Sequence, residues 1–168
     1  MRLRPLRPAW VISTPEFYFS SPKNMAHQPF SGPIPDDRLY CPRYDMWIQE
    51  GANGEILIGA TSFGVFLAGE IIAFTSKPKG AEVDIGRGMG TVECRKTVLA
   101  VHAPVSFVLL EGNDEAEERP KLVNLEPYGK GWMARARPTC WDEEKLTLVD
   151  AATYRQQILK IEPEATFG

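Results

Sequence analysis

The sequence predicts a mainly β fold, in which antiparallel strands are accompanied by short helices and by one helix near the C-terminus. Residues 90–101 hold two runs rich in β-branched and apolar residues around a short polar centre, which favours two strands joined by a tight turn. Asn53 and Gly54 separate two further apolar runs, and an Asn-Gly pair is a strong hairpin signal. Asp150 precedes residues 151–160, whose apolar residues recur at helical spacing, so we expect a capped helix there.

The other elements follow from local signals along the chain. Thr61 or Ser62 can cap a short helix over residues 63–68, and Gly69 can end it. We further expect strands at residues 45–49, 55–60, 71–75, 107–110 and 133–137, an acidic turn and helix start at residues 111–118 capped by Asn113 or Asp114, and a linker or short helix at residues 141–148.

The composition is that of a globular domain. The chain has 168 residues, a net charge of −3 and 43% hydrophobic residues, which is enough apolar material for a core. No basic excess indicates nucleic acid, and no apolar run reaches the roughly 18 residues of a membrane span, so we expect neither partner. The three cysteines, Cys41, Cys94 and Cys140, are too widely spaced for a disulfide framework or a metal pair. A reducing compartment fits them best, and we expect a cytoplasmic protein.

Residues 1–38 differ in composition from the rest of the chain. Prolines recur through them and break every possible helix, and basic residues outnumber acidic ones before residue 36. We therefore expect a proline-rich, flexible extension, a domain over residues 39–161 and a tail over residues 162–168. A mitochondrial transit peptide is disfavoured, because the prolines prevent the amphipathic helix that such peptides need. Met25 is an alternative start, which would leave residues 1–24 outside the protein.

Gly86, Gly88 and Gly90 form a cluster with two possible explanations. Glycine-rich loops cradle phosphate groups when a strand precedes the loop and a helix follows it. A predicted strand follows this cluster instead. We therefore favour a turn and a close approach between sheets.

The sequence shows no catalytic constellation. His27 lies in the extension and His102 on a presumed strand, so a strand histidine is favoured over a Ser-His-Asp site. Glu115, Glu117 and Glu118 fit a solvated face better than a general acid–base pair, because isolated charges lack the surroundings that perturb pKa values. The sequence therefore favours a carrier over an enzyme.

The stretch around Lys96 has two interpretations. By residue type alone, a lysine at a hairpin tip is a solvated charge that discourages aggregation. The stretch also resembles the lipoyl-attachment hairpin of the glycine cleavage system H proteins, which have Val-Glu-Ser-x-Lys before the turn and Tyr-Ala-Pro-Val-Ser after it. Here residues 92–96 are Val-Glu-Cys-Arg-Lys and, at the same spacing, residues 102–106 are His-Ala-Pro-Val-Ser. The resemblance implies that Lys96 carries the lipoyl group in amide linkage, and that Glu93 helps the lipoate-attaching enzyme to recognise the hairpin.

A second motif carries the same resemblance far from Lys96. The family has Pro-x-Leu-Val-Asn-x-x-Pro-Tyr-Gly-x-Gly-Trp, and residues 120–132 match every fixed position. Residues 58–61, 69–71 and 80–83 also follow the family pattern. The resemblance extends from about residue 40 to residue 159. It implies a barrel-sandwich hybrid of antiparallel strands, the fold of lipoyl and biotinyl carrier domains, with short helices.

The resemblance also implies a function. It is that of a non-catalytic lipoyl carrier, which shuttles an aminomethyl group between partner enzymes during glycine decarboxylation. The implied cofactor is covalent lipoate on Lys96, and the implied partners of this monomer are lipoate ligase or lipoyl transferase, glycine decarboxylase, aminomethyltransferase and dihydrolipoyl dehydrogenase. The alternative from another class is a protein that keeps the hairpin, is not lipoylated and only binds partners.

Three departures from the family pattern bear on the glycine-specific role. The family's His-Glu-Trp reads Asp-Met-Trp at residues 45–47, with one extra residue after Tyr40, and residues 97–100 are more apolar than in the family. Phe107 replaces the family's glycine after Ser106. In addition, Cys94 replaces the family's serine two residues before Lys96. A second branch fits these changes, namely the lipoate-binding proteins of heterodisulfide-reductase-like sulfur oxidation, which carry sulfur intermediates to heterodisulfide-reductase-like subunits. A thiol at Cys94 can exchange with a dithiolane or hold a persulfide, or it can simply be a small apolar residue.

Overall fold

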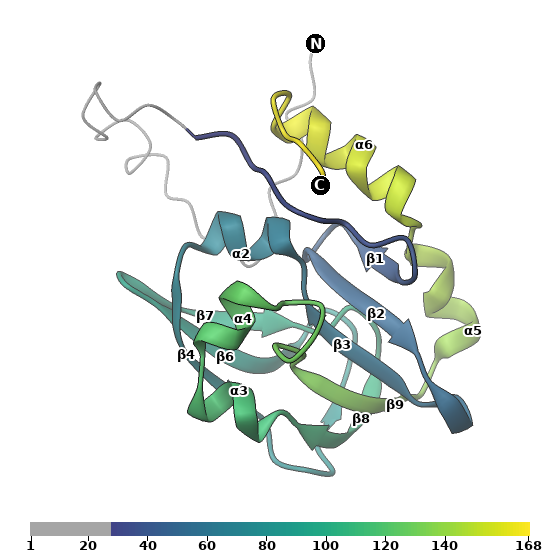
Figure 1. Cartoon of the computed structure of the whole chain (residues 1–168). Helices are drawn as coiled ribbons and strands as arrows, with labels where there is room; N and C mark the ends of the chain where they lie inside the picture. The colour runs from purple at the N-terminus through teal and green to yellow at the C-terminus, as the bar shows by residue number, and fades with distance from the viewer. Residues whose placement is uncertain (1–27) are drawn as a thin grey trace.

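The structure is a computed structural model that describes residues 28–168. Its strands form two sheets around one core, with short helices packed around them and a longer helix, α6 (Ala151–Ile161), near the C-terminus (Figure 1). This arrangement confirms the prediction of a mainly β fold with antiparallel strands, short helices and a C-terminal helix.

The two sheets differ in size. The larger has six strands in the order β1-β2-β3-β9-β8-β5, and the smaller has three in the order β4-β6-β7. All of these strand pairs are antiparallel. The larger sheet consists of β1 (Leu39–Cys41), β2 (Met46–Glu50), β3 (Ile56–Ala60), β5 (Glu82–Val83), β8 (Phe107–Gly112) and β9 (Ala134–Pro138), and the smaller of β4 (Ile71–Ser76), β6 (Gly88–Cys94) and β7 (Thr97–His102).

Short helical segments connect the strands. They are η1 (Ala52–Gly54), α2 (Ser62–Ala68), α3 (Asp114–Glu118), α4 (Lys121–Leu125), α5 (Trp141–Glu144) and η2 (Lys145–Thr147). Within residues 28–168, no helix has the length and apolar character needed to cross a bilayer.

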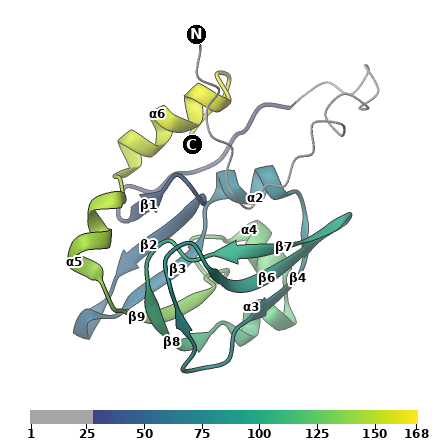
Figure 2. The same ribbon diagram turned by 180° about the vertical axis from the view of Figure 1, so that it is seen from behind.

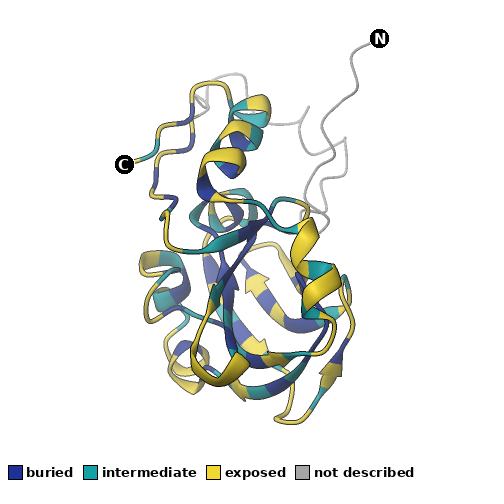
Figure 3. Cartoon of the chain, turned by 90° about the vertical axis from the view of Figure 1, so that its right-hand side faces the viewer, coloured by how far each residue is buried: buried dark blue, intermediate teal, exposed yellow. Residues whose placement is uncertain are grey.

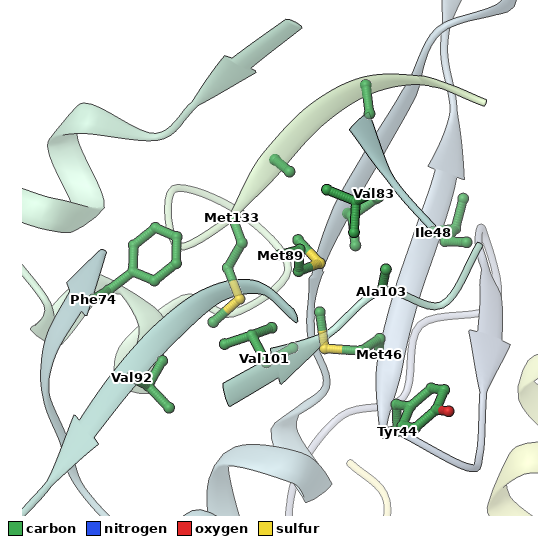
Figure 4. Close-up of a cluster of buried hydrophobic side chains, with 14 of the residues drawn as sticks. Tyr44, Met46, Ile48, Phe74, Val83, Met89, Val92, Val101, Ala103 and Met133 are labelled. Atoms are coloured by element: carbon green, nitrogen blue, oxygen red, sulfur yellow. The ribbon is translucent and has the colours of Figure 1, made fainter. Parts of the chain in front are cut away.

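The core lies between the two sheets and receives side chains from both (Figure 4). Met46 and Ile48 come from β2, Phe74 from β4, Val92 from β6, and Met133 from the residue before β9. Each of these side chains is at most 4% exposed. Full burial of such a side chain contributes roughly 1.5–3 kcal/mol, so this core holds the two sheets together.

Local signals correctly predicted the N-terminal caps of α2, α3 and α6 and the C-terminal end of α2. Thr61 caps α2, because its side chain accepts a hydrogen bond from the Gly64 amide at 2.9 Å. Asn113 caps α3 and Asp150 caps α6 in the same way. Gly69 ends α2 with a φ of 86°, a value that favours glycine. Buried residues follow one side of α6 and exposed residues the other (Figure 3).

The N-terminal part of the described chain is packed on the domain. Phe30 and Ile34 are 2% and 3% exposed, and Ser31 forms a parallel bridge with Thr166 near the C-terminus. The amide of Gly32 donates to the carbonyl of Thr166 at 3.1 Å. The expectation of a flexible extension is therefore wrong for residues 28–38, because prolines exclude a helix but permit an extended segment with buried apolar side chains. The expectations about residues 1–27, including His27 and the start at Met25, lie outside the described residues.

The C-terminal end is likewise not a free tail. Ala165 belongs to a buried cluster with Phe30, and Phe167 packs against it. The rings of Phe30 and Phe167 have centroids 6.3 Å apart. The two ends of the described chain thus form one packed unit, here called the terminal clasp and defined as residues 30–34 and 165–167.

The helix α4 was not predicted. It has five residues, and it follows Pro120, whose backbone is already helical with φ of −57° and ψ of −21°. Such a short helix is marginal on its own. A tertiary contact completes it, because the Asn124 side chain pairs with the backbone of Ile71 in β4.

Candidate functional site

The hairpin formed by β6 and β7 presents Lys96 at its tip. Cys94 and Thr97 form the last pair of the ladder, so Arg95 and Lys96 alone make the turn. Both turn residues are exposed, and the end of the hairpin projects past the rest of the fold (Figures 1 and 2). Among the described non-glycine residues only Asp45 and Asn53 have positive φ, so the turn needs no glycine and tolerates two long side chains. The tight turn expected here is confirmed.

The surroundings of Lys96 leave its amine free. The Lys96 side chain makes no hydrogen bond or ion pair with any of residues 28–168. Its neighbour Arg95 pairs with Glu70 at 3.2 Å, and both of these side chains are largely exposed. Such a surface pair adds little stability, but it occupies the one acidic side chain at the start of β4. The amine of Lys96 is therefore open to an incoming reagent or enzyme.

Glu93 lies on the outer face of the small sheet. Along β6 the buried residues Val92 and Cys94 alternate with the exposed residues Thr91 and Glu93. Among the described residues the Glu93 carboxylate has no hydrogen-bond or ion-pair partner. It is thus available to a partner that contacts the outer face of the hairpin.

Cys94 points into the core instead. It is 5% exposed, and burial, followed by the charge of Glu93, raises the pKa of its thiol. A raised pKa suppresses the thiolate that exchange reactions require. The structure therefore favours the interpretation of Cys94 as a small apolar residue over that of a redox partner for a dithiolane.

The base of the hairpin is a packed turn. His102 lies on β7, and its Nδ1 lies 2.8 Å from the carbonyl oxygen of Gly86. The His102 ring stacks on Tyr44 with centroids 5.2 Å apart. Gly86 has a φ of 81°, and a Cβ at Gly90 would lie 2.6 Å from the carbonyl oxygen of Thr75. The glycines thus serve a turn and a close approach of strands, as expected, and His102 is a strand histidine.

The acidic residues of α3 lie on an exposed face. Glu115, Glu117 and Glu118 are all exposed. Glu117 accepts a hydrogen bond from the backbone amide of Ser76 at 2.6 Å, which attaches α3 to the end of β4. This supports the interpretation of these residues as a solvated face.

Comparison with known proteins shows the family to which this chain belongs. The sequence model described as "Glycine cleavage H-protein" matches residues 38–161. The chain belongs to this family. It is 37% identical over 122 residues to glycine cleavage system H protein 5 of Aquifex aeolicus, a match that covers 70% of this chain and 82% of that protein. It is 32% identical over 130 residues to the H protein of Mycobacterium leprae, covering 76% of this chain and 98% of the relative.

A solved structure agrees with the assignment. The crystal structure of a glycine cleavage system H protein from Mycobacterium marinum aligns with a TM-score of 0.63 and 32% identity, and covers 73% of this chain and 97% of that one. The family resemblance and the barrel-sandwich fold predicted from the sequence are confirmed. The terminal clasp lies outside the residues matched by the family model.

The family motif at residues 120–132 supports the hairpin from a distance. Asn124 accepts a hydrogen bond from the Ile71 amide at 2.9 Å and donates one to the Ile71 carbonyl at 2.8 Å, so it acts as a neighbouring strand would. A Cβ at Gly131 would collide with the carbonyl oxygen of Leu122. Pro127 accepts a 3.0 Å hydrogen bond from the indole of Trp47. Of these contacts, the pair of hydrogen bonds from Asn124 holds β4, the strand that borders β6 beside Lys96.

Asp45, which replaces the family's histidine, is withdrawn from the surface. It is 2% exposed, and its Oδ1 accepts a 2.7 Å hydrogen bond from the hydroxyl of Tyr154. Burial raises its pKa to about 7. Sequence reasoning missed this contact; the one available signal was a tyrosine on the apolar side of the predicted C-terminal helix. In this member of the family the position supports the fold.

Proposed function

We propose that the chain is a lipoyl-group carrier in glycine cleavage and that the Nζ of Lys96 is its attachment point. One observation carries the proposal: in a chain of the H-protein family, an exposed lysine without a partner among the described residues stands at the tip of a projecting two-strand hairpin. The site needs such a lysine because a tethered arm can reach other proteins only from a point clear of the fold.

The chemistry of attachment requires little from this chain. The neutral amine of Lys96 attacks the carboxyl carbon of lipoyl adenylate. An amide bond forms, the bond between that carbon and the phosphate oxygen breaks, Nζ loses a proton, and AMP leaves. When bound, lipoate supplies a dithiolane that is reversibly reduced and can carry a group on sulfur. The contribution of the chain is to expose Nζ and to hold the anchor still. The β6–β7 ladder and the contacts of Asn124 provide that rigidity.

The proposed partners follow from the carrier role. They are a lipoate ligase or lipoyl transferase, which loads Lys96, and the glycine cleavage enzymes, namely glycine decarboxylase, aminomethyltransferase and dihydrolipoyl dehydrogenase. A tethered group meets each enzyme at a high effective concentration while the carrier is docked. In the proposed role the chain leaves catalysis to these partner enzymes.

Intact mass after lipoylation tests the proposal. The full chain is produced with a lipoate–protein ligase and free lipoate, beside Lys96→Arg and a control, Lys77→Arg, at another exposed lysine. We expect a single lipoyl increment on the wild type and on Lys77→Arg, and none on Lys96→Arg. An unmodified wild type, in a reaction where an established acceptor domain is modified, would overturn the proposal in favour of a binding module without lipoate.

A further inference from the structure

Two large apolar side chains stand exposed on the outer face of the small sheet, close to Lys96. Ile72 on β4 is 46% exposed, and Val98 on β7 is 60% exposed. The strand order β4-β6-β7 places them on either side of the central strand. Glu93 on β6 pairs with Ala73 on one side and with Val98 on the other.

A β-bulge brings Ile72 to this face. The ladder between β4 and β6 pairs Ile71 with Cys94 and Ala73 with Glu93, so Ile72 is the extra residue. In such a bulge two residues oppose one on the partner strand, and the local twist re-aims a side chain. Ile71 itself is buried and held by Asn124. The fold thus anchors β4 on one side of the bulge and leaves a large apolar side chain outside.

Within the described residues, Glu93 is the unpaired charged residue between the two apolar side chains of this face. Arg95 is already paired with Glu70, and Glu93 has no partner among residues 28–168. The outer face therefore presents a carboxylate between two apolar side chains. Its complement is a protein surface with apolar contacts on both sides of a basic residue.

We propose that Ile72 and Val98 form, around Glu93, the docking surface for the enzyme that attaches the lipoyl group to Lys96. This inference rests on the proposed function. The attaching enzyme must bring its active site to Nζ before any arm exists, so it must contact the protein next to Lys96. Val98 is two residues from Lys96, and Glu93 is three residues from it. Enzymes that act on the loaded carrier react with the far end of the arm, so they need not contact Ile72, Glu93 and Val98.

Lipoylation kinetics test the inference. The double variant Ile72→Thr/Val98→Thr keeps β-branched residues in the strands and exchanges apolar groups for hydroxyls. Initial rates are measured with a lipoate–protein ligase, free lipoate and ATP while the carrier concentration is varied. We expect KM for the carrier to rise at least about tenfold, with kcat within about twofold of wild type.

Ile85→Thr is the matched control. Ile85 is 41% exposed, and it precedes Gly86, which bonds to Ala103 at the opposite end of the hairpin from Lys96. Its KM should equal that of the wild type, and all three proteins should unfold at the same temperature. Unchanged KM in the double variant would overturn the inference and leave the proposed function intact. The inference would also be overturned by a double variant that is lipoylated at the wild-type rate but is then a poor substrate for glycine decarboxylase. Ile72 and Val98 would in that case form the docking surface for glycine decarboxylase. A wild type that no ligase modifies would defeat the proposed function itself.

Discussion

The hydroxyl of Tyr154 on α6 donates a hydrogen bond of 2.7 Å to Oδ1 of Asp45, the residue before β2. The same hydroxyl lies 2.7 Å from Oγ1 of Thr61, the N-cap of α2. All three side chains are buried, and Oδ2 of Asp45 has no hydrogen-bond partner among the described residues. One polar network therefore joins the C-terminal helix, β2 and α2, and it holds a carboxyl group that is not fully satisfied.

Asp45→Asn should change how stability depends on pH. Burial raises the pKa of Asp45 in the fold to about 7, from an ordinary value of 3.8. The folded state therefore holds the proton more tightly, and the stability that Asp45 contributes is fully present below pH 4 and is lost as pH rises to about 7. The loss is at most about 4 kcal/mol. The wild type should thus weaken relative to Asp45→Asn between pH 4 and pH 7, as measured by urea unfolding at several pH values.

The comparison of wild type with Asp45→Asn needs a control variant, and one result would contradict the prediction. Asparagine suits this position, because Asp45 has a φ of 54° and asparagine tolerates that region. Asp84→Asn, at an exposed turn residue, shows the effect of removing a carboxylate that stays in water. If the difference in unfolding free energy between wild type and Asp45→Asn is the same at pH 4.5 and pH 8, Asp45 is not the titrating group.

Local patterns predicted the elements of this fold well, but they could not predict its long-range polar contacts. The caps at Thr61 and Asp150 and the turn at Asn53 depend on neighbouring residues, so the sequence shows them directly. Asp45 and Tyr154 are 109 positions apart. Nothing near either residue indicates that they meet, and the terminal clasp was missed for the same reason.

Gly59→Ala should destabilise the fold although the change adds one methyl group. Gly59 on β3 faces Trp47 on β2, and a Cβ there would lie 2.5 Å from the indole ring. The indole has little room to move, because it donates a hydrogen bond to Pro127 and lies under the guanidinium of Arg38. We expect a loss of about 1–3 kcal/mol in the free energy of unfolding. Gly88→Ala, where a Cβ meets nothing within 4 Å, is the control and should lose less than half as much.

Phe30→Ala should release the terminal clasp. The Phe30 ring makes edge-on contacts with Phe63 at 5.3 Å and Phe66 at 5.5 Å, and the ring of Phe167 lies beside it. Truncation of a buried phenylalanine costs about 3–5 kcal/mol where the whole fold depends on it. Hydrogen exchange should show faster exchange at the amides of residues 32 and 166, whose bonds close the clasp. Phe30→Leu should restore most of the protection, and unchanged exchange in Phe30→Ala would show that the clasp forms without the ring.

The hairpin that holds the candidate site was predicted from the sequence more completely than the core contacts, because its residues are consecutive. The hairpin, its turn and the outward position of Glu93 all follow from alternation along residues 88–102. The bulge that turns Ile72 outward does not, because its position depends on how β4 aligns with β6 and on the hold that Asn124 has on Ile71. The apolar part of the outer face could therefore be seen only in the structure.

Glu93→Gln should slow lipoylation of Lys96 while the fold is unaffected. The change removes the charge and keeps the shape of a side chain that is exposed and has no partner among the described residues. If a basic group of the attaching enzyme pairs with this carboxylate, kcat/KM should fall about tenfold at low salt, and the deficit should shrink as ionic strength rises, because salt screens an exposed pair. Glu82→Gln, at an exposed position on β5, controls for the loss of one negative charge and should be modified at the rate of the wild type. A wild-type rate for Glu93→Gln at low salt would mean that the enzyme reaches Lys96 without this contact, and the apolar residues on either side would then have to account for recognition alone.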